Sequence, residues 1–440
     1  MLEIKTKSGE ATAQPLERVS IRSSRKGLLA VRDGAGREYV RRRATKSARV
    51  QVGGALGTHV VHLLDDEGRM LETATCRVDC RTGIEDSGGR FAKLHDMAYW
   101  TMSRWGKGTR SLWWRGKFYH FFVRWLRDHV HAMKGMKYYW PELKTGIELY
   151  RDSQREDGMI WDNVMPRTRE YNTWQWRFEY GDFIRLINDP IWELKRIPVE
   201  NDVEYLYLEG IYWTWKATGD DAWMASCLDS ALRAVHYSTH DPYRWSAKYK
   251  LLKRGFTVDT WDFQAAPDAA ISGDPMCIRL DDGRFGVMHG DNTGFAAACR
   301  YLAEMLEHVR RRAEAARIRT LGRQIKRRLD KLAWNGRFYT HHVPEDRRVR
   351  RDLGVDLDQQ VSVSNAYALG RGLPHEQCAA ILRTYQRIRE QMPASSPGEF
   401  YQIYPPFERG FGPHNARWEY MNGGVSTIVA GELARVRVPL

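Results

Sequence analysis

The sequence has no long apolar run and no motif for a metal or a disulfide framework. No stretch approaches the ~20 apolar residues of a membrane helix, and the start lacks the apolar region of a secretory signal. The six cysteines show no paired spacing, and neither a glycine-rich phosphate loop nor an HExxH motif is present. We expect no metal and no organic cofactor, and a cytoplasmic protein unless a leader is missing from this copy.

The formal net charge of +14 would suit a nucleic-acid-binding protein, but the basic residues are spread along the chain. The densest block, residues 310–334, has apolar residues at helical spacing, so its arginines are expected to form the solvated face of a helix. The hydrophobic fraction of 42% is that of a soluble globular protein. We expect neither nucleic acid nor a membrane as a partner, and the oligomeric state stays open.

What the chain has in excess is aromatic residues, with 17 Trp and 21 Tyr. Many lie outside helical periodicity, in segments such as 170–183 and 399–412. Aromatic residues in loops either pack the loops onto a scaffold or offer faces on which sugar rings or bases stack. Because several loops share this habit, a ligand surface is a serious alternative to packing.

The 440 residues are enough for two or three domains. Residues 1–85 read as β structure, with pairs of short strands around the turns "DDEG" and "DGAG", and a small sandwich-like domain is predicted. From about residue 90 to residue 440 the pattern is helical, including 111–133 and 416–436. Helical pairs are expected at 201–220 with 221–240, 289–309 with 310–334, and 362–372 with 373–392.

The first helices of these pairs are richer in aromatic and small residues, and the second are more basic and polar. This asymmetry fits an inner ring of helices surrounded by an outer ring, since the outer helices need a solvated face. A solenoid would have more regular periods and shorter loops. The predicted fold class is therefore mainly α, an incomplete (α/α)6 toroid preceded by the small β domain.

The segment "RGFTVDTWDF", residues 254–263, places Asp259 and Asp262 around Trp261 among apolar residues. Carboxylates beside apolar rings are costly unless something compensates. One compensation is proton transfer beside a bound ligand, because a desolvated carboxyl has a raised pKa. The alternative is that one of the two acids caps a turn or pairs with Arg254.

The series "GIELYRDSQREDGMI", "NDVEYLYLEGIYWTWKATGD", "FTVDTWDF", "HGDNTGF", "SVSNAYALGRGL" and "WEYMNGG" resembles the six-hairpin glycosidases, which include the glucoamylases and amylo-α-1,6-glucosidases. The resemblance covers about residues 90–440, and many members of the group carry a β-sandwich ahead of the toroid. It implies a glycoside hydrolase whose general acid lies near a tryptophan before an inner helix. Asp262 is the residue that this implies, with Asp259 in reserve.

The resemblance places the general base near the end of the toroid. About nine or ten helices are expected where twelve close the ring, so the usual base would lie beyond Leu440 in a truncated chain. Within the chain, Glu399 and Glu419 are the candidates, each flanked by aromatic residues. Glu419 is also expected to orient Arg417 or a helix start.

Hydrolysis with inversion would need the two carboxyl groups roughly 6.5–9.5 Å apart. Two other functions stay open: a toroid polysaccharide lyase, whose product absorbs in the near ultraviolet, and a carbohydrate-binding protein without turnover. In each case the partner is a carbohydrate. Residues that could line a sugar pocket are Trp174, Trp176, Arg177, Trp261, His289, Asp291 and Asn422, although Asn292 or Thr293 beside them could instead be a helix cap.

Overall fold

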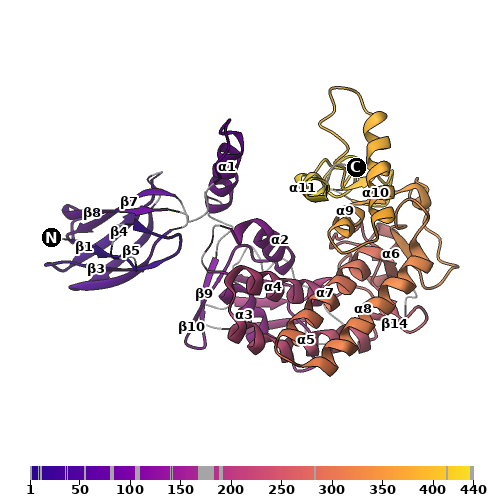
Figure 1. Ribbon diagram of the computed structural model, residues 1–440, viewed down its shortest axis with the longest axis horizontal. Helices are drawn as coiled ribbons and strands as arrows, with labels where there is room; N and C mark the ends of the chain where they lie inside the picture. Colours follow the sequence, from indigo (N-terminus) through magenta and orange to yellow (C-terminus); the bar gives the residue numbers. More distant parts are fainter. Residues whose placement is uncertain are drawn as a thin grey trace. The chain divides into compact units, whose positions relative to one another are not determined.

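The computed structural model divides the chain into two compact units (Figure 1). The first consists of Met1–Leu149 with Lys216–Thr218, and the second of Tyr150–Trp215 with Gly219–Leu440. The structure describes residues 2–7, 9, 12–34, 36, 38–53, 56–79, 84–104, 110–138, 140, 142–166, 183–187, 192–281, 284–412 and 415–436.

The first unit begins with two sheets that share one apolar core. One sheet has the order β1-β3-β6 and the other β2-β8-β7-β4-β5, and every pairing is antiparallel except that of β2 with β8. The core residues, such as Ile21 and Leu63, come from both sheets. The strands are β1 (Glu3–Lys5), β2 (Thr12–Ala13), β3 (Arg18–Arg22), β4 (Gly27–Arg32), β5 (Glu38–Ala44), β6 (Ser47–Gln51), β7 (Gly57–Leu64) and β8 (Met70–Val78).

The helix predicted over residues 111–133 is wrong in its first half. That half forms a hairpin of β9 (Arg110–Trp114) and β10 (Lys117–Phe121). Its two-residue turn has φ of 49° at Arg115 and 73° at Gly116, the left-handed pair that favours a tight hairpin over a helix. The helices of this region are α1 (Arg90–Arg104), α2 (Leu126–Met136) and α3 (Lys144–Ser153), which runs into the second unit.

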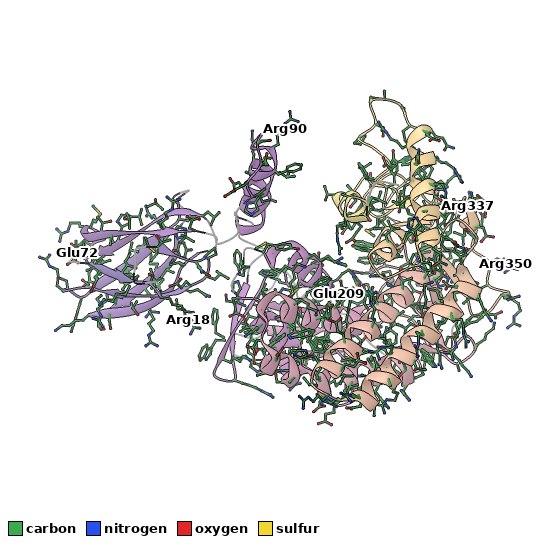
Figure 2. All side chains as sticks on the ribbon, in the orientation of Figure 1. Arg18, Glu72, Arg90, Glu209, Arg337 and Arg350 are labelled. Atoms are coloured by element: carbon green, nitrogen blue, oxygen red, sulfur yellow. The ribbon has the colours of Figure 1, made fainter. Side chains whose placement is uncertain are left out.

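Helical hairpins dominate the second unit, and their burial confirms the predicted difference between first and second helices. The first helices are buried on nearly every side, whereas the second helices keep an exposed polar face. Figure 2 shows Glu209, of the first hairpin, in the interior of the unit and Arg350 at its surface. The hairpins are α4 (Val203–Thr218) with α5 (Asp221–His240), α7 (His289–His308) with α8 (Arg312–Ala333), and α9 (Val363–Leu369) with α10 (His375–Glu390).

The turn between the first two helices contains a glycine stop and an aspartate cap. Gly219 has φ of 66°, and the carboxylate of Asp220 accepts a hydrogen bond from the Trp223 N–H.

Among the buried helices, α7 contacts α5 and α9 as well as its partner α8. The last helix, α11 (Thr427–Val436), packs on α9. No helix in the described part of the chain has the length and hydropathy to cross a membrane.

Short strands precede the buried helices, and the sequence did not predict them. β16 (Gly286–Met288) leads directly into α7 and pairs with β17 (His342–Pro344). β18 (Val361–Ser362) leads directly into α9 and pairs with β19 (Ile403–Tyr404). These pairings bring distant loops to the N-terminal ends of α7 and α9. The other short elements are β11 (Asn163–Pro166), β12 (Ile184–Ile187), β13 (Trp192–Lys195), β14 (Trp245–Ser246), β15 (Leu251–Leu252) and α6 (Ala266–Ser272).

Candidate active site

The segment 254–263 lies where α7 and α9 begin, and Arg254 attaches it there. The Arg254 side chain is fully buried. One guanidinium nitrogen lies 3.5 Å from a carboxylate oxygen of Asp291, in the first turn of α7. Another donates to the carbonyl of Trp261 at 3.0 Å. A buried guanidinium that pairs with a carboxylate and also donates to a carbonyl holds the turn against the helix.

Asp259 is buried and acts as a cap for α9. One carboxylate oxygen accepts the backbone N–H of Ser364 at 3.0 Å, and the other accepts the Ser364 hydroxyl at 2.5 Å. Its own N–H donates to Nε2 of His341 at 2.8 Å. An anion is stabilised at a helix N-terminus, where backbone N–H groups lack partners within the helix. Of the two alternatives left open by the sequence, the geometry of Asp259 matches the cap.

The pKa of Asp259 lies below its usual value, which is the opposite of what a general acid needs. Burial by itself raises the pKa, but His341, His289 and the hydroxyls of Ser362 and Ser364 outweigh it. Asp259 also has φ of 45°, a conformation in which a residue with a side chain is strained. Such strain persists only where the surrounding contacts impose it.

The histidines beside Asp259 are neutral at physiological pH. Burial lowers the pKa of His289 to about 3 and that of His341 to about 4. Because Nε2 of His341 accepts the Asp259 N–H, the proton of its neutral ring is on Nδ1. Nε2 of His289 lies 3.1 Å from the Ser362 hydroxyl, and the ring stacks on Tyr339. Both histidines therefore belong to the buried layer beneath the turn.

The turn also contributes to an aromatic cluster, which we define as Trp261, Phe263 and Tyr420. Trp418, on the same loop as Tyr420, instead contacts Tyr401 and Tyr404, with ring centroids 5.6 and 6.2 Å away. The ring centroids of Trp261 and Phe263 are 5.1 Å apart, and those of Trp261 and Tyr420 are 4.9 Å apart with an edge-to-face angle of 81°. Trp418 is 47% exposed and Tyr420 is 59% exposed. Exposed rings held in fixed positions are suited to stacking on a sugar.

The loop that carries Trp418 and Tyr420 is not the helix start that the sequence predicted. Its backbone is left-handed at Trp418 (φ 74°) and at Tyr420 (φ 37°), which no helix allows. Gly423, with φ of 93°, lies so close to Pro406 that a side chain would clash. Two large aromatic residues in this conformation indicate a loop whose shape is imposed by its anchors.

Asn422, which the sequence placed among the residues of a sugar pocket, is the main anchor of the loop. The side chain is buried, accepts the Phe407 N–H at 2.7 Å, and donates to the carbonyls of Phe407 and Asn415 at 3.0 and 3.1 Å. All three contacts are to the backbone, so the amide of Asn422 is committed to the protein itself. It shapes the loop that presents the rings.

The candidate carboxylates lie on segments that the structure joins. Asp262 is half-buried in the turn next to Trp261, and the Trp261–Tyr420 contact connects this turn with the loop of Glu419, which is exposed. Glu399 is 4% exposed. The segment that follows it is joined to the same loop by hydrogen bonds from Gln402 N–H to Gly424 O (2.9 Å) and from Ser426 N–H to Phe400 O (2.7 Å). Glu419 does not orient Arg417, whose guanidinium faces Glu408 at 3.8 Å.

The remaining predicted residues fall into two groups. His289 and Asp291 lie at the start of α7 and are buried. Asn292 and Thr293 follow within that first turn and do not cap the helix; the Asn292 amide instead bonds both backbone groups of Leu252. The second group, Trp174, Trp176 and Arg177, lies outside the described residues.

Sequence reasoning missed the buried arginines. Arg196 and Arg244 are fully buried like Arg254, and Arg196 pairs with Glu204 on α4 at 3.0 Å. The sequence carried a signal for Arg196 alone, which lies shortly before α4 with Glu204 in its first turn, a pattern that also fits a surface pair. In the described part of the chain no group of three or more His, Cys, Asp or Glu side chains is arranged to hold a metal ion.

Comparison with known proteins finds glycosidases among solved structures. A scan against protein-family models finds no match, and neither does a search of the curated proteins. A rhamnosidase from Klebsiella oxytoca with rhamnose bound is 11% identical, with 96% of this chain and 88% of that chain covered and a TM-score of 0.44. The GH63 mannosylglycerate hydrolase from Thermus thermophilus in complex with glucose is 15% identical, with 78% and 87% covered and a TM-score of 0.47.

A GH78 family rhamnosidase of Bacillus sp. GL1 is 12% identical, with 86% of this chain and 37% of that chain covered and a TM-score of 0.43. These three solved structures are glycosidases by their descriptions.

Proposed function

We propose that this chain is a glycoside hydrolase that binds an oligo- or polysaccharide at the aromatic cluster. The observation that carries the proposal is the contact of Trp261 with Tyr420, because it joins the turn of Asp262 to the loop of Glu419. Carboxyl groups next to exposed aromatic rings are the combination that hydrolysis of a sugar chain requires. The helical hairpins of the second unit would supply the scaffold as part of an α/α toroid.

In this proposal Asp262 is the general acid. Its carboxyl group donates a proton to the glycosidic oxygen as the bond from that oxygen to the anomeric carbon breaks. Water attacks the anomeric carbon from the opposite face, and a second carboxylate accepts the proton that the water loses. Glu419 is preferred as this base because it is exposed beside the rings, whereas Glu399 is almost fully buried. The product then has the inverted configuration.

Asp259 has a positioning role in the same scheme. Its carboxylate is held as an anion by Ser364, so it supplies no proton at neutral pH. It fixes the turn three residues before Asp262 against the start of α9, and thereby fixes the direction of the general acid. A change of the cap is expected to disturb the turn as a whole.

The test compares Asp262→Asn with Asp281→Asn, an exposed aspartate of the same unit that pairs with Arg279 on the surface. Turnover is measured as new reducing ends on a panel of oligosaccharides. We expect Asp262→Asn to lower kcat by at least about 100-fold, the usual contribution of a general acid, and Asp281→Asn to leave it unchanged. Equal turnover in the two variants would refute the role of Asp262.

The same experiment separates the other two functions. Sugar binding by the unaltered protein with no turnover of any substrate in the panel would identify a carbohydrate-binding protein, for which the exposed aromatic cluster would suffice. Products that absorb in the near ultraviolet would identify a lyase, since elimination leaves a double bond in the sugar ring. Either result would replace the hydrolase proposal.

A further inference from the structure

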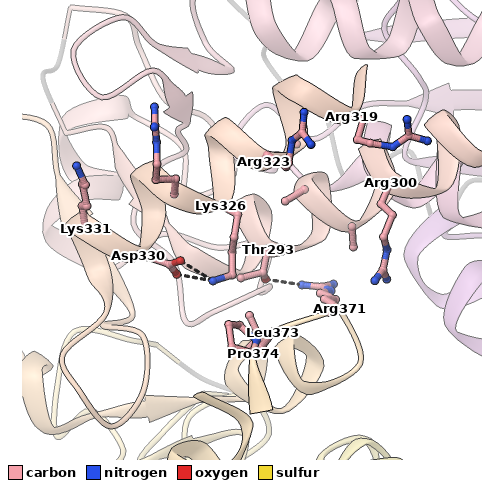
Figure 3. Close-up of a pocket in the computed structure, with 15 residues that line it drawn as sticks. Thr293, Arg300, Arg319, Arg323, Lys326, Asp330, Lys331, Arg371, Leu373 and Pro374 are labelled. Carbon is pink, nitrogen blue, oxygen red and sulfur yellow. Dashed lines mark hydrogen bonds and ion pairs between the residues drawn. The ribbon is translucent and has the colours of Figure 1, made fainter. Parts of the chain in front are cut away.

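A concave site of about 700 Å³ lies between α7, α8 and the turn that joins α9 to α10 (Figure 3). Seven arginine or lysine side chains and one carboxylate, that of Asp330, line it. None of these residues belongs to the aromatic cluster or to the candidate carboxylates. The volume is that of a small-molecule site.

Small residues keep this site open. Ala296 and Ala297 on α7 and Gly322 on α8 line it together with Gly372. A Cβ added at Gly322 would lie 2.8 Å from the Cβ of Cys299, so the two helices approach closely there. At Gly372, with φ of 80°, an added Cβ would lie 2.5 Å from the Arg300 guanidinium. Because Gly372 has no side chain, the Arg300 guanidinium can lie next to its backbone.

The cations differ in whether the protein neutralises them. Lys326 pairs with Asp330 at 2.6 Å, and Arg319 pairs with Glu307 at 2.6 Å. Arg371 donates to the Gly290 carbonyl at 2.9 Å, the Thr293 hydroxyl at 3.0 Å and the Tyr205 hydroxyl at 3.3 Å, and the Glu209 carboxylate also acts on its charge. Figure 3 shows the Arg300 side chain ending near Arg371, with Arg319 and Arg323 farther up in the view.

Three further cations form a stripe along α8. Arg323, Arg327 and Lys331 follow one another at intervals of four residues, so they lie on one face of the helix. In the described part of the chain no carboxylate pairs with any of the three. Like charges at this spacing destabilise a helix, and an anion that bridges them would remove that repulsion.

We propose that this site binds a compact anion with several negative charges, of the phosphate class, such as a phosphate ester or an oligophosphate. Planar guanidinium groups match the geometry of phosphate oxygens and stay charged at every physiological pH. The concave shape and the limited volume favour a compact ligand over a polymer. A nucleic acid would need positive charge that continues along its backbone beyond one small site, and it is one of the outcomes that the experiment distinguishes.

The experiment measures the binding of inorganic tripolyphosphate to the full chain by calorimetry at fixed ionic strength. The test variant is Arg327→Gln with Lys331→Gln, and the matched control is Arg312→Gln with Arg317→Gln. All four residues are exposed on α8, and the control pair does not line the site. Both variants lose two positive charges from the same helix, so a general effect of net charge is the same in each. Thermal melting checks that both remain folded.

We expect the test variant to weaken tripolyphosphate binding about tenfold or more, the effect of one or two lost hydrogen bonds to a charged group, and the control to weaken it less than about twofold. Equal weakening in both variants would overturn the proposal, as would undetectable binding by the unaltered protein. Tighter binding of a single-stranded oligonucleotide, lost equally in both variants, would also overturn it and would identify a nucleic-acid surface. None of these outcomes depends on glycosidase activity.

Discussion

Replacing Asp259 by asparagine separates a positioning role from a catalytic one. Both carboxylate oxygens of Asp259 accept hydrogen bonds from Ser364, at 3.0 and 2.5 Å, in a fully buried site. An asparagine can keep only one acceptor there. With its oxygen toward the Ser364 N–H, the asparagine would donate to the Ser364 hydroxyl oxygen, so the hydroxyl proton would lose its acceptor and the negative charge at the start of α9 would be lost.

A hydrogen bond to a charged group contributes about 1.5–3 kcal/mol, and a buried donor left without an acceptor adds a cost of similar size. We therefore expect Asp259→Asn to lower the free energy of unfolding by about 2–4 kcal/mol. For a helical unit of this size that corresponds to a fall in Tm of roughly 5–15 °C. Ser364→Ala removes one of the two bonds, and in the double variant the two effects should be less than additive by about 1 kcal/mol.

The assay is urea denaturation of the four proteins, followed by circular dichroism at several pH values. Because the folded-state pKa of Asp259 is below its unfolded value of 3.8, its stabilising contribution is complete above that value. The contribution is lost as the pH falls through the folded-state pKa. The difference between the unaltered protein and Asp259→Asn should therefore be largest near neutral pH and should shrink below about pH 4.

The reasoning is refuted if Asp259→Asn unfolds in urea at neutral pH like the unaltered protein but has lost turnover. That outcome would mean that the carboxylate acts on the substrate and that its bonds to Ser364 contribute little to the fold. A loss of stability with turnover that recovers when the protein is kept folded, for example at low temperature, supports the positioning role.

Three more predictions concern the layers of the same site. Tyr420→Ala should weaken sugar binding about tenfold, a typical loss for a stacking ring, and leave Tm nearly unchanged because the ring is 59% exposed; a large fall in Tm would show that the ring serves packing. Asn422→Ala should lower the free energy of unfolding by about 2–3 kcal/mol, and with it Tm, since three backbone groups lose their hydrogen-bond partner. It should also lower sugar affinity, because the loop loses its shape. An unchanged Tm would contradict its role as anchor. Acidification should destabilise the fold between pH 6.5 and about pH 4, because His289 and His341 take up protons in the unfolded chain but stay neutral where they are buried in the folded protein. Each histidine contributes about 1.4 kcal/mol per pH unit to the free energy of unfolding. His341→Gln should therefore reduce the slope of this free energy against pH, measured by urea denaturation at several pH values, and an unaltered slope would contradict this account.

Most of the long helices could be predicted because their patterns are local. The apolar spacing in α8, and the glycine and aspartate between α4 and α5, depend only on nearby residues. The predictions failed where the apolar pattern was ambiguous. Residues 110–121 could be read as a helix until the Arg115–Gly116 turn reverses the chain, and residues 416–424 could be read as a helix start until left-handed residues exclude it.

The candidate site was predictable in part for the same reason. Two acids placed among aromatic rings identified the turn, because their cost in free energy is visible in the sequence. Their separate roles were not visible, because Asp259 accepts its hydrogen bonds from Ser364, which lies 105 residues later in the sequence. The contact of Trp261 with Tyr420 likewise joins segments that no local pattern connects. Long-range pairing decides which acid is committed to the fold and which stays at the surface.

The left-handed backbone at Trp418 and Tyr420 has a practical consequence for anyone who improves this protein by directed evolution. An ordinary residue in that conformation costs about 1–2 kcal/mol, whereas glycine has almost no such cost. A library selected for heat resistance alone would therefore accumulate glycine at both positions and discard the two rings. Selection would have to include retention on a sugar column if a gain in heat resistance is not to remove the surface that is proposed to bind the sugar.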